Sequence, residues 1–324
     1  MKYKLLTKLF LFVIPAFCQS YPGLEITNGV LKAGLHLPDP EKGSYRATRF
    51  DWSGIVYSLE YKGHQYFGQW YPRHDPLVHD AITGPAESFD GEGQLGFDEA
   101  APGGLFLRIG VGHAVRPDSR PFSTFTTYKL ADPGEWKVTH GKNWVEFRHA
   151  VANKIGYAYT YVKRITLVPG KPEMVISHRL ANAGPKPIRG TQYNHNFFVI
   201  DQQPSGPGYR VIFPFPLKPL GNFRGMLDAQ GNELVFYKEF TGNLSVQSWL
   251  EGFGKSPRDY DIRIENRPAG AGVRISSDRP IVRLNFWTRR ETVCPEPYIA
   301  ISVDPGRTQT WEYRYLFYTL DQPR

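Results

Sequence analysis

Apolar and polar residues alternate along most of this chain in short runs, which is the two-residue period of β-strands. In the segment 311–318 the large aromatic residues occupy every second position, and the segment 157–167 shows the same alternation. Helical periodicity is nearly absent. Similar short runs predict further strands at residues 54–61, 105–111, 144–149, 173–180, 209–213, 233–240, 272–276 and 282–287.

Clusters of Gly, Pro, Asn and Asp separate these runs, and such residues supply the backbone angles that turns require. The regular spacing of short strands and turns predicts an antiparallel β-sandwich or barrel. The longest region interpreted as irregular, Tyr71 to Gly104, is rich in Gly, His and acidic residues. Long structured loops on β scaffolds often carry function.

The N-terminus has the pattern of a secretory signal peptide. Three lysines precede an apolar run from Leu9 to Phe17, which is too short to span a bilayer. We expect cleavage near Cys18, so that residues 1–18 are removed and residues 19–324 form a single exported domain, secreted or periplasmic, with no membrane association. Cys294 is then the only cysteine left, and no intramolecular disulfide is expected.

Charge and composition narrow the range of partners. The formal net charge is +8, but the basic residues are spread along the chain without the block that nucleic-acid patches show. We therefore expect no nucleic-acid partner. Aromatic residues make up 15% of the chain, and their rings serve both as strand formers and as stacking surfaces for sugar faces.

Two motifs carry a resemblance to a known family. The first is YNHNFF, residues 193–198, which follows a strand and an Asn-Ala-Gly-Pro turn; the second is the segment 294–318, with Glu296, a Pro-Gly turn at 305–306 and a closing strand of alternating aromatics. In this order and spacing they resemble the aldose 1-epimerase (galactose mutarotase) superfamily. The resemblance implies an antiparallel β-supersandwich of the galactose mutarotase type. It covers roughly residues 165–318.

The same resemblance implies a chemistry. Interconverting the α and β anomers of a sugar requires a base for the C1 hydroxyl and an acid for the ring oxygen. By resemblance, Glu296 is the base and His195 the acid, and neither step needs a metal or organic cofactor. Asn194 and Asn196 are expected to orient His195 or to bind sugar hydroxyls.

Other residues are candidates for the sugar site. The second histidine and the early Asn-Arg pair of familiar galactose mutarotases are missing, and His113 is a possible substitute. Arg49 is a candidate for gripping an anionic sugar through bidentate contacts, and Trp52 and Trp70 for stacking on it. The resemblance also implies an aspartate that grips sugar hydroxyls, and its candidates are Asp228, Asp259 and Asp261. His74, Asp75, His79 and Asp80 are metal-capable but lack a fixed frame, so no metal site is expected.

Two other functions fit the same scaffold. One is a non-catalytic carbohydrate-binding protein, and the other is a polysaccharide lyase or hydrolase, for which the acidic loop at 87–99 offers paired carboxylates. An epimerase predicts that His195 and Glu296 face one another across a pocket sized for one pyranose. A binding protein predicts a shallow aromatic strip. In each case the partner is a sugar or oligosaccharide, and the protein is expected to be a monomer.

Overall fold

The computed structural model describes residues 21–91 and 94–320, and they form antiparallel sheets with very little helix. The predicted signal peptide, residues 1–18, lies outside the described residues. The helical turns in the described part are short 3₁₀ segments, η2 (Ile200–Gln202) and η3 (Pro257–Asp259). No helix among the described residues is long and apolar enough to cross a membrane.

The largest sheet has ten strands, in the order β16, β17, β14, β19, β20, β23, β12, β11, β10, β9. In chain order they are β9 (Glu135–His140), β10 (Trp144–Val151), β11 (Tyr159–Leu167), β12 (Glu173–Asn182), β14 (Tyr209–Ile212), β16 (Leu227–Gln230), β17 (Glu233–Phe236), β19 (Asp261–Asn266), β20 (Ala271–Ser277) and β23 (Thr308–Thr319). The alternation predicted at 157–167 and 311–318 is confirmed in β11 and β23, whose odd-numbered residues from 159 to 167 and 311 to 317 are buried.

The second sheet has six strands, in the order β15, β18, β21, β22, β13, β5. They are β5 (Ala86–Gly91), β13 (Ile188–His195), β15 (Lys218–Pro219), β18 (Ser245–Glu251), β21 (Arg283–Arg289) and β22 (Thr292–Val303). Strands β13 and β22 carry the two motifs of the family resemblance, and they are hydrogen-bonded neighbours from Ile188 opposite Val303 to Tyr193 opposite Tyr298.

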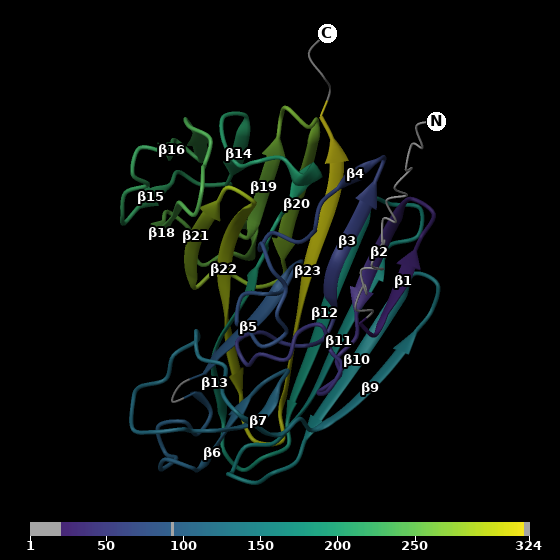
Figure 1. Ribbon diagram of the computed structural model, residues 1–324, viewed down its shortest axis with the longest axis vertical. Helices are drawn as coiled ribbons and strands as arrows, with labels where there is room; N and C mark the ends of the chain where they lie inside the picture. Colours follow the sequence, from purple (N-terminus) through teal and green to yellow (C-terminus); the bar gives the residue numbers. More distant parts are fainter. Residues whose placement is uncertain (1–20, 92–93, 321–324) are drawn as a thin grey trace, which may run out of the picture.

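Two smaller sheets complete the structure. One contains β1 (Gly23–Thr27), β2 (Leu31–His36), β3 (Ile55–Tyr61) and β4 (His64–Gln65), and the other contains β6 (Leu105–Arg108), β7 (Gly112–Val115) and β8 (Leu130–Asp132). In Figure 1 the long yellow strand β23 lies near the middle, with β13, β22 and β5 on one side and β1 to β3 on the other.

The inner faces of the ten-stranded and six-stranded sheets meet through aromatic and polar side chains. Tyr313 and Tyr315 of β23 donate hydrogen bonds to Gln192 and Asn196, which belong to β13 and the residue after it. Around them a large apolar cluster includes the buried Trp311, Phe317 and Ile299. Burying this apolar surface is the main stabilising contribution, because no disulfide links the described residues.

The region 71–104 is not wholly irregular, and this interpretation is corrected. Strand β5 lies within it and pairs with β13, placing Glu87 beside Asn194. The sequence pattern does not indicate this strand, because an inward position carries a carboxylate: Glu87 is fully buried. Buried cations explain how the core accepts this charge, as described below.

Candidate active site

The outer face of the six-stranded sheet collects polar side chains from neighbouring strands. Tyr193 and Tyr298 are directly opposite each other, so two residues further along each strand His195 and Glu296 come to the same face. Asn285 of β21 is directly opposite Glu296 on the other side. The period-two geometry of three adjacent strands therefore brings together residues that are up to 101 positions apart in the chain.

His195 and Glu296 are in direct contact. His195 Nε2 lies 3.2 Å from Glu296 Oε1, and Asn285 Nδ2 donates to Glu296 Oε2 at 3.0 Å. The two side chains are only 6% and 4% exposed. The expectation of a sugar held between the two residues is corrected, because no pyranose fits into 3.2 Å.

Aromatic rings fix the imidazole of His195. Phe197 stacks on it with ring centroids 3.8 Å apart and an interplanar angle of 9°, while Phe50 and Trp287 meet it edge-on at 6.0 and 5.2 Å. Trp70 in turn stacks on Phe197, with ring centroids 4.7 Å apart. This packing excludes water from one side of the ring, and His195 Nδ1 has no hydrogen-bond partner among the described residues.

Burial changes the protonation of both groups. It lowers the pKa of His195 well below its usual value, helped by the positive charge of Arg49. It raises the pKa of Glu296 to about 7, although the Asn285 hydrogen bond and Arg49 act in the opposite direction. Desolvation thus disfavours the charged form of each group. Near pH 7 the imidazole of His195 is therefore neutral, and the carboxyl of Glu296 gains and loses one proton. Such a group suits acid and base catalysis.

A cation lies beside the pair. The Arg49 guanidinium forms an ion pair with Asp80 and donates a hydrogen bond to the Tyr193 hydroxyl at 3.2 Å. His79 Nε2 is 3.1 Å from the second carboxylate oxygen of Asp80. Burial acts to raise the pKa of Asp80, but His79 and Arg49 outweigh it and keep the carboxylate ionised. Arg49 therefore stays charged at the edge of the site.

An aromatic strip extends from the pair across the same face of the sheet. Tyr193 and Tyr298 stack with centroids 4.3 Å apart, and Trp249 lies 5.7 Å from Tyr298. The exposed Arg283 covers both rings, 4.4 Å from Trp249 and 5.2 Å from Tyr298. Within the described residues Arg283 forms no ion pair with a carboxylate. Tyr193 and Tyr298 are only 3% and 6% exposed, so the accessible end of the strip consists of the half-buried Trp249 and the exposed Arg283.

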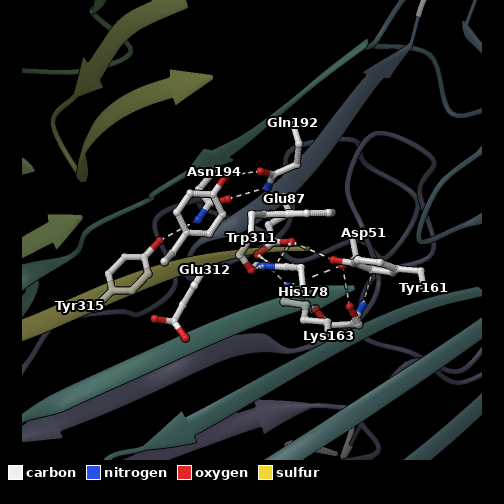
Figure 2. A network of polar contacts seen from close by, with 12 residues as sticks. Asp51, Glu87, Tyr161, Lys163, His178, Gln192, Asn194, Trp311, Glu312 and Tyr315 are labelled. Carbon is white, nitrogen blue, oxygen red and sulfur yellow. Dashed lines mark hydrogen bonds and ion pairs between the residues drawn. The ribbon is translucent and has the colours of Figure 1, made fainter. Parts of the chain in front are cut away.

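A second polar network lies on the opposite, inner side of β5 and β13. Figure 2 shows the Glu87 carboxylate next to His178 and Lys163, at 3.0 and 3.2 Å, with Asp51 and Tyr161 close by. Lys163 is also 3.5 Å from Asp51, and its ammonium donates to the Ser53 carbonyl at 3.0 Å. Burial would raise the pKa of Glu87, but His178 and Lys163 lower it to about 2. This network joins β5 to the ten-stranded sheet.

The structure places the two asparagines of the opening motif in the interior. Asn194 Nδ2 donates to the Tyr315 hydroxyl at 2.8 Å, and Asn196 Nδ2 donates to the Pro295 carbonyl at 2.8 Å. Both side chains are fully buried. Their amides hold β13 against β23, as Figure 2 shows for Asn194 and Tyr315. Both asparagines therefore belong to the contact between the two sheets, and neither is placed to bind a sugar hydroxyl.

The other candidates divide into two groups. Arg49 and Trp70 lie in the cluster around His195, as described above. Trp52 is fully buried and donates through Nε1 to the Ala47 carbonyl at 2.8 Å, and His113 is buried on β7 with its Nδ1 3.9 Å from Asp132. Neither side chain forms a hydrogen bond, an ion pair or a ring contact with His195 or Glu296. Residues 228, 259 and 261 belong to or border strands of the ten-stranded sheet.

Several residues of the site were not anticipated in these roles. The sequence indicates Asp80 only as a metal-capable residue, and Asn285 and Trp287 only as part of a predicted strand or its end. The roles of Asn285 and Trp287 follow from the register of β21 with β22, and that of Asp80 follows from its ion pair with Arg49. A single sequence shows neither. Among the described residues, no group of three or more His, Cys, Asp or Glu side chains is arranged to hold a metal ion.

Comparisons with known proteins agree with this architecture. No protein-family model and no curated protein sequence matches the chain. Solved structures do. The Slr1438 protein of Synechocystis is 13% identical, with 95% of this chain and 100% of that chain covered and a TM-score of 0.57. A galactose mutarotase related enzyme from Lactobacillus acidophilus is 12% identical, with 93% and 99% covered and a TM-score of 0.55.

A third structure, a galactose mutarotase-like protein from Lactobacillus casei, is 13% identical, with 91% of this chain and 100% of that chain covered and a TM-score of 0.53. The protein is thus an antiparallel β-supersandwich. Its fold is that of the galactose mutarotase-like proteins, and the predicted fold class is confirmed.

Proposed function

We propose that this protein is an aldose 1-epimerase-like isomerase that interconverts the α and β anomers of a sugar. The contact between His195 and Glu296 carries the proposal. Two titratable groups 3.2 Å apart, which exchange one proton near pH 7, provide both an acid and a base at one end of an aromatic strip. The neighbour from Lactobacillus acidophilus named as a galactose mutarotase related enzyme supports the same chemistry.

In this mechanism the sugar lies over the aromatic strip with its anomeric centre at the pair. The one proton of the pair first moves from Glu296 to His195 across their 3.2 Å contact. Glu296 then removes the proton from the C1 hydroxyl as His195 protonates the ring oxygen, the C1–O5 bond breaks, and the open aldehyde rotates about the C1–C2 bond. Reclosure returns each proton to its donor, so that no atom or electron is gained or lost. Arg49 stabilises negative charge on the oxygen atoms during ring opening.

Mutarotation of freshly dissolved α-glucose, α-galactose and α-galacturonic acid, followed by polarimetry or proton NMR, tests this function. Wild type should accelerate at least one sugar, and Glu296→Gln and His195→Asn should each abolish the acceleration. Glu41→Gln and His140→Asn are matched controls, because both side chains are exposed. Acceleration that survives in either site variant would contradict the proposal.

A non-catalytic sugar-binding protein is the second candidate. The half-buried Trp249 at the accessible end of the aromatic strip favours it, because an aromatic ring can bind a sugar face whether or not the acid/base pair catalyses a reaction. The same experiment separates the two functions. Saturable binding that Trp249→Ala weakens, with no acceleration of mutarotation for any sugar, would establish binding alone.

A further inference from the structure

A cavity of about 450 Å³ lies apart from the His195–Glu296 pair, between the four-stranded sheet and the segments 44–45 and 69–83. This volume falls within the roughly 300–1,000 Å³ range of small-molecule pockets. None of the residues of the acid/base pair or of the aromatic strip lines it. Two lining residues contact neighbours of the pair: Tyr45 lies 6.1 Å from Phe50, and Tyr71 meets Trp70 edge-on at 5.7 Å. The cavity is therefore a separate site.

Five rings form a continuous chain along the cavity wall. Tyr57 and His36 have centroids 4.6 Å apart, Tyr21 meets His36 at 5.7 Å and His74 at 5.1 Å, and His74 lies 5.6 Å from Tyr71. All five residues line the cavity. These rings come from four separate segments of the chain, and together they present apolar faces and polar edges to a ligand in the cavity.

The cavity wall is uncharged at neutral pH. None of the described residues that line it is Asp, Glu, Lys or Arg. Burial lowers the pKa of His36 to about 4, and burial also lowers the pKa of His74, so both imidazoles are neutral at pH 7. An anionic ligand would find no cation in this wall and an ammonium group no carboxylate. The ligand expected here is neutral.

Neutral polar groups in the wall distinguish between neutral ligands. The lining includes Tyr21, Tyr57 and Tyr71, whose rings carry hydroxyl groups, and Gln69, which carries an amide. A purely apolar ligand, or a quaternary ammonium bound by the rings alone, would make no use of these hydrogen-bonding groups. A polyol with apolar C–H faces matches the ring faces and the polar groups together.

We propose that this cavity is a second saccharide site, which takes an uncharged sugar unit between its aromatic walls. The proposal does not depend on mutarotase activity. It assigns the protein two sugar contacts, a reactive or binding site at His195 and Glu296 and a holding site beyond Trp70. Such an arrangement would let one saccharide be retained while another unit is presented to the pair.

Isothermal titration of the full chain with glucose, maltose, cellobiose, glucuronic acid and choline chloride tests the cavity. At least one neutral sugar should bind, and Tyr21→Ala and His74→Ala should each weaken its binding at least tenfold. Tyr237→Ala, at an exposed tyrosine outside the cavity, should leave that binding unchanged. Thermal unfolding checks that each variant is folded. If a cavity variant does not fold, Tyr71→Phe is measured in its place.

Three results would overturn the proposal: no neutral sugar binds, binding is unaffected by the cavity variants, or choline binds more tightly than every neutral sugar. Mutarotation rates measured on the same variants keep the two proposals apart. Loss of sugar binding in Tyr21→Ala with normal mutarotation supports the second site. Absence of mutarotation in wild type contradicts the proposed catalytic function and leaves the cavity result standing.

Discussion

His195 and Glu296 approach each other to 3.2 Å from neighbouring strands of one sheet, and both are almost fully buried. Burial lowers the pKa of the imidazole and raises that of the carboxyl to about 7. These shifts place the one proton of the pair on Glu296 near neutral pH, and its transfer to His195 gives a pair with one acid and one base. Its properties lead to the first two predictions.

The pH dependence of mutarotation should report this proton. Since the singly protonated pair is the active form, kcat/KM should fall as pH rises through about 7, where the proton is lost. Initial rates measured from pH 5 to pH 9 at constant ionic strength check this. A rate that keeps rising above pH 7 would show that loss of the proton activates the enzyme, contrary to the one-proton mechanism.

Glu296→Gln should stabilise the protein at alkaline pH while removing activity. The folded-state pKa of Glu296, about 7, lies above its ordinary value of 4.5, so the folded state holds the proton more tightly. This contribution to stability is present below pH 4.5 and is lost as pH rises through about 7. At 1.36 kcal/mol per pKa unit, the ionised carboxylate costs wild type about 3 kcal/mol at pH 8.

Thermal unfolding of wild type and Glu296→Gln at pH 5 and pH 8 measures this difference. The variant should gain stability relative to wild type at pH 8 and differ little at pH 5. Glu41→Gln, at an exposed position, should differ little from wild type at both values. A variant less stable than wild type at pH 8 would mean that the Asn285 and Arg49 contacts outweigh the cost of burial.

Lys163 should be essential for stability. Its ammonium lies 3.2 Å from Glu87 and 3.5 Å from Asp51, all fully buried, so Lys163→Met would leave two carboxylates facing each other with less compensation. Removing one partner of a buried ion pair costs about 3–5 kcal/mol. Urea unfolding measures this loss. Lys218→Met is the control, because the exposed Lys218–Glu251 pair should contribute about 0–1 kcal/mol.

Arg108 should act as a positioning residue for Arg49. Its buried guanidinium donates to the carbonyls of Thr48, Arg49 and Phe89 at 3.2, 2.9 and 2.7 Å, which ties the segment carrying Arg49 to strand β5. Lysine cannot reproduce this fork. Because small displacements of catalytic groups cost up to about 100-fold in rate, Arg108→Lys should lower kcat more than it raises KM.

Arg116→Lys provides the matched control for this prediction. Arg116 also donates to backbone carbonyls, those of Phe97 and Ala100 at 2.9 Å each, but it does not contact the segment of Arg49. Its replacement should leave kcat close to that of wild type. Equal losses of kcat in both variants would indicate general loosening of the structure and contradict a specific role for Arg108.

The sequence by itself determined the class of the fold and the two motifs that carry the pair. Alternation of apolar residues marked β11 and β23, because one face of each strand is buried against the core. The motifs around His195 and Glu296 were recognisable because they are local. Where a local pattern was broken by a buried charge, as at Glu87 in β5, the strand was missed.

Only the tertiary structure decided which residues meet. The register of β13, β22 and β21 brings His195, Glu296 and Asn285 onto one face, while the same alternation turns Asn194 inward to Tyr315. A sequence shows that neighbouring residues point to opposite faces, but not which face receives the ligand. The ionisation of Glu296 likewise depends on burial by segments that are distant in the chain.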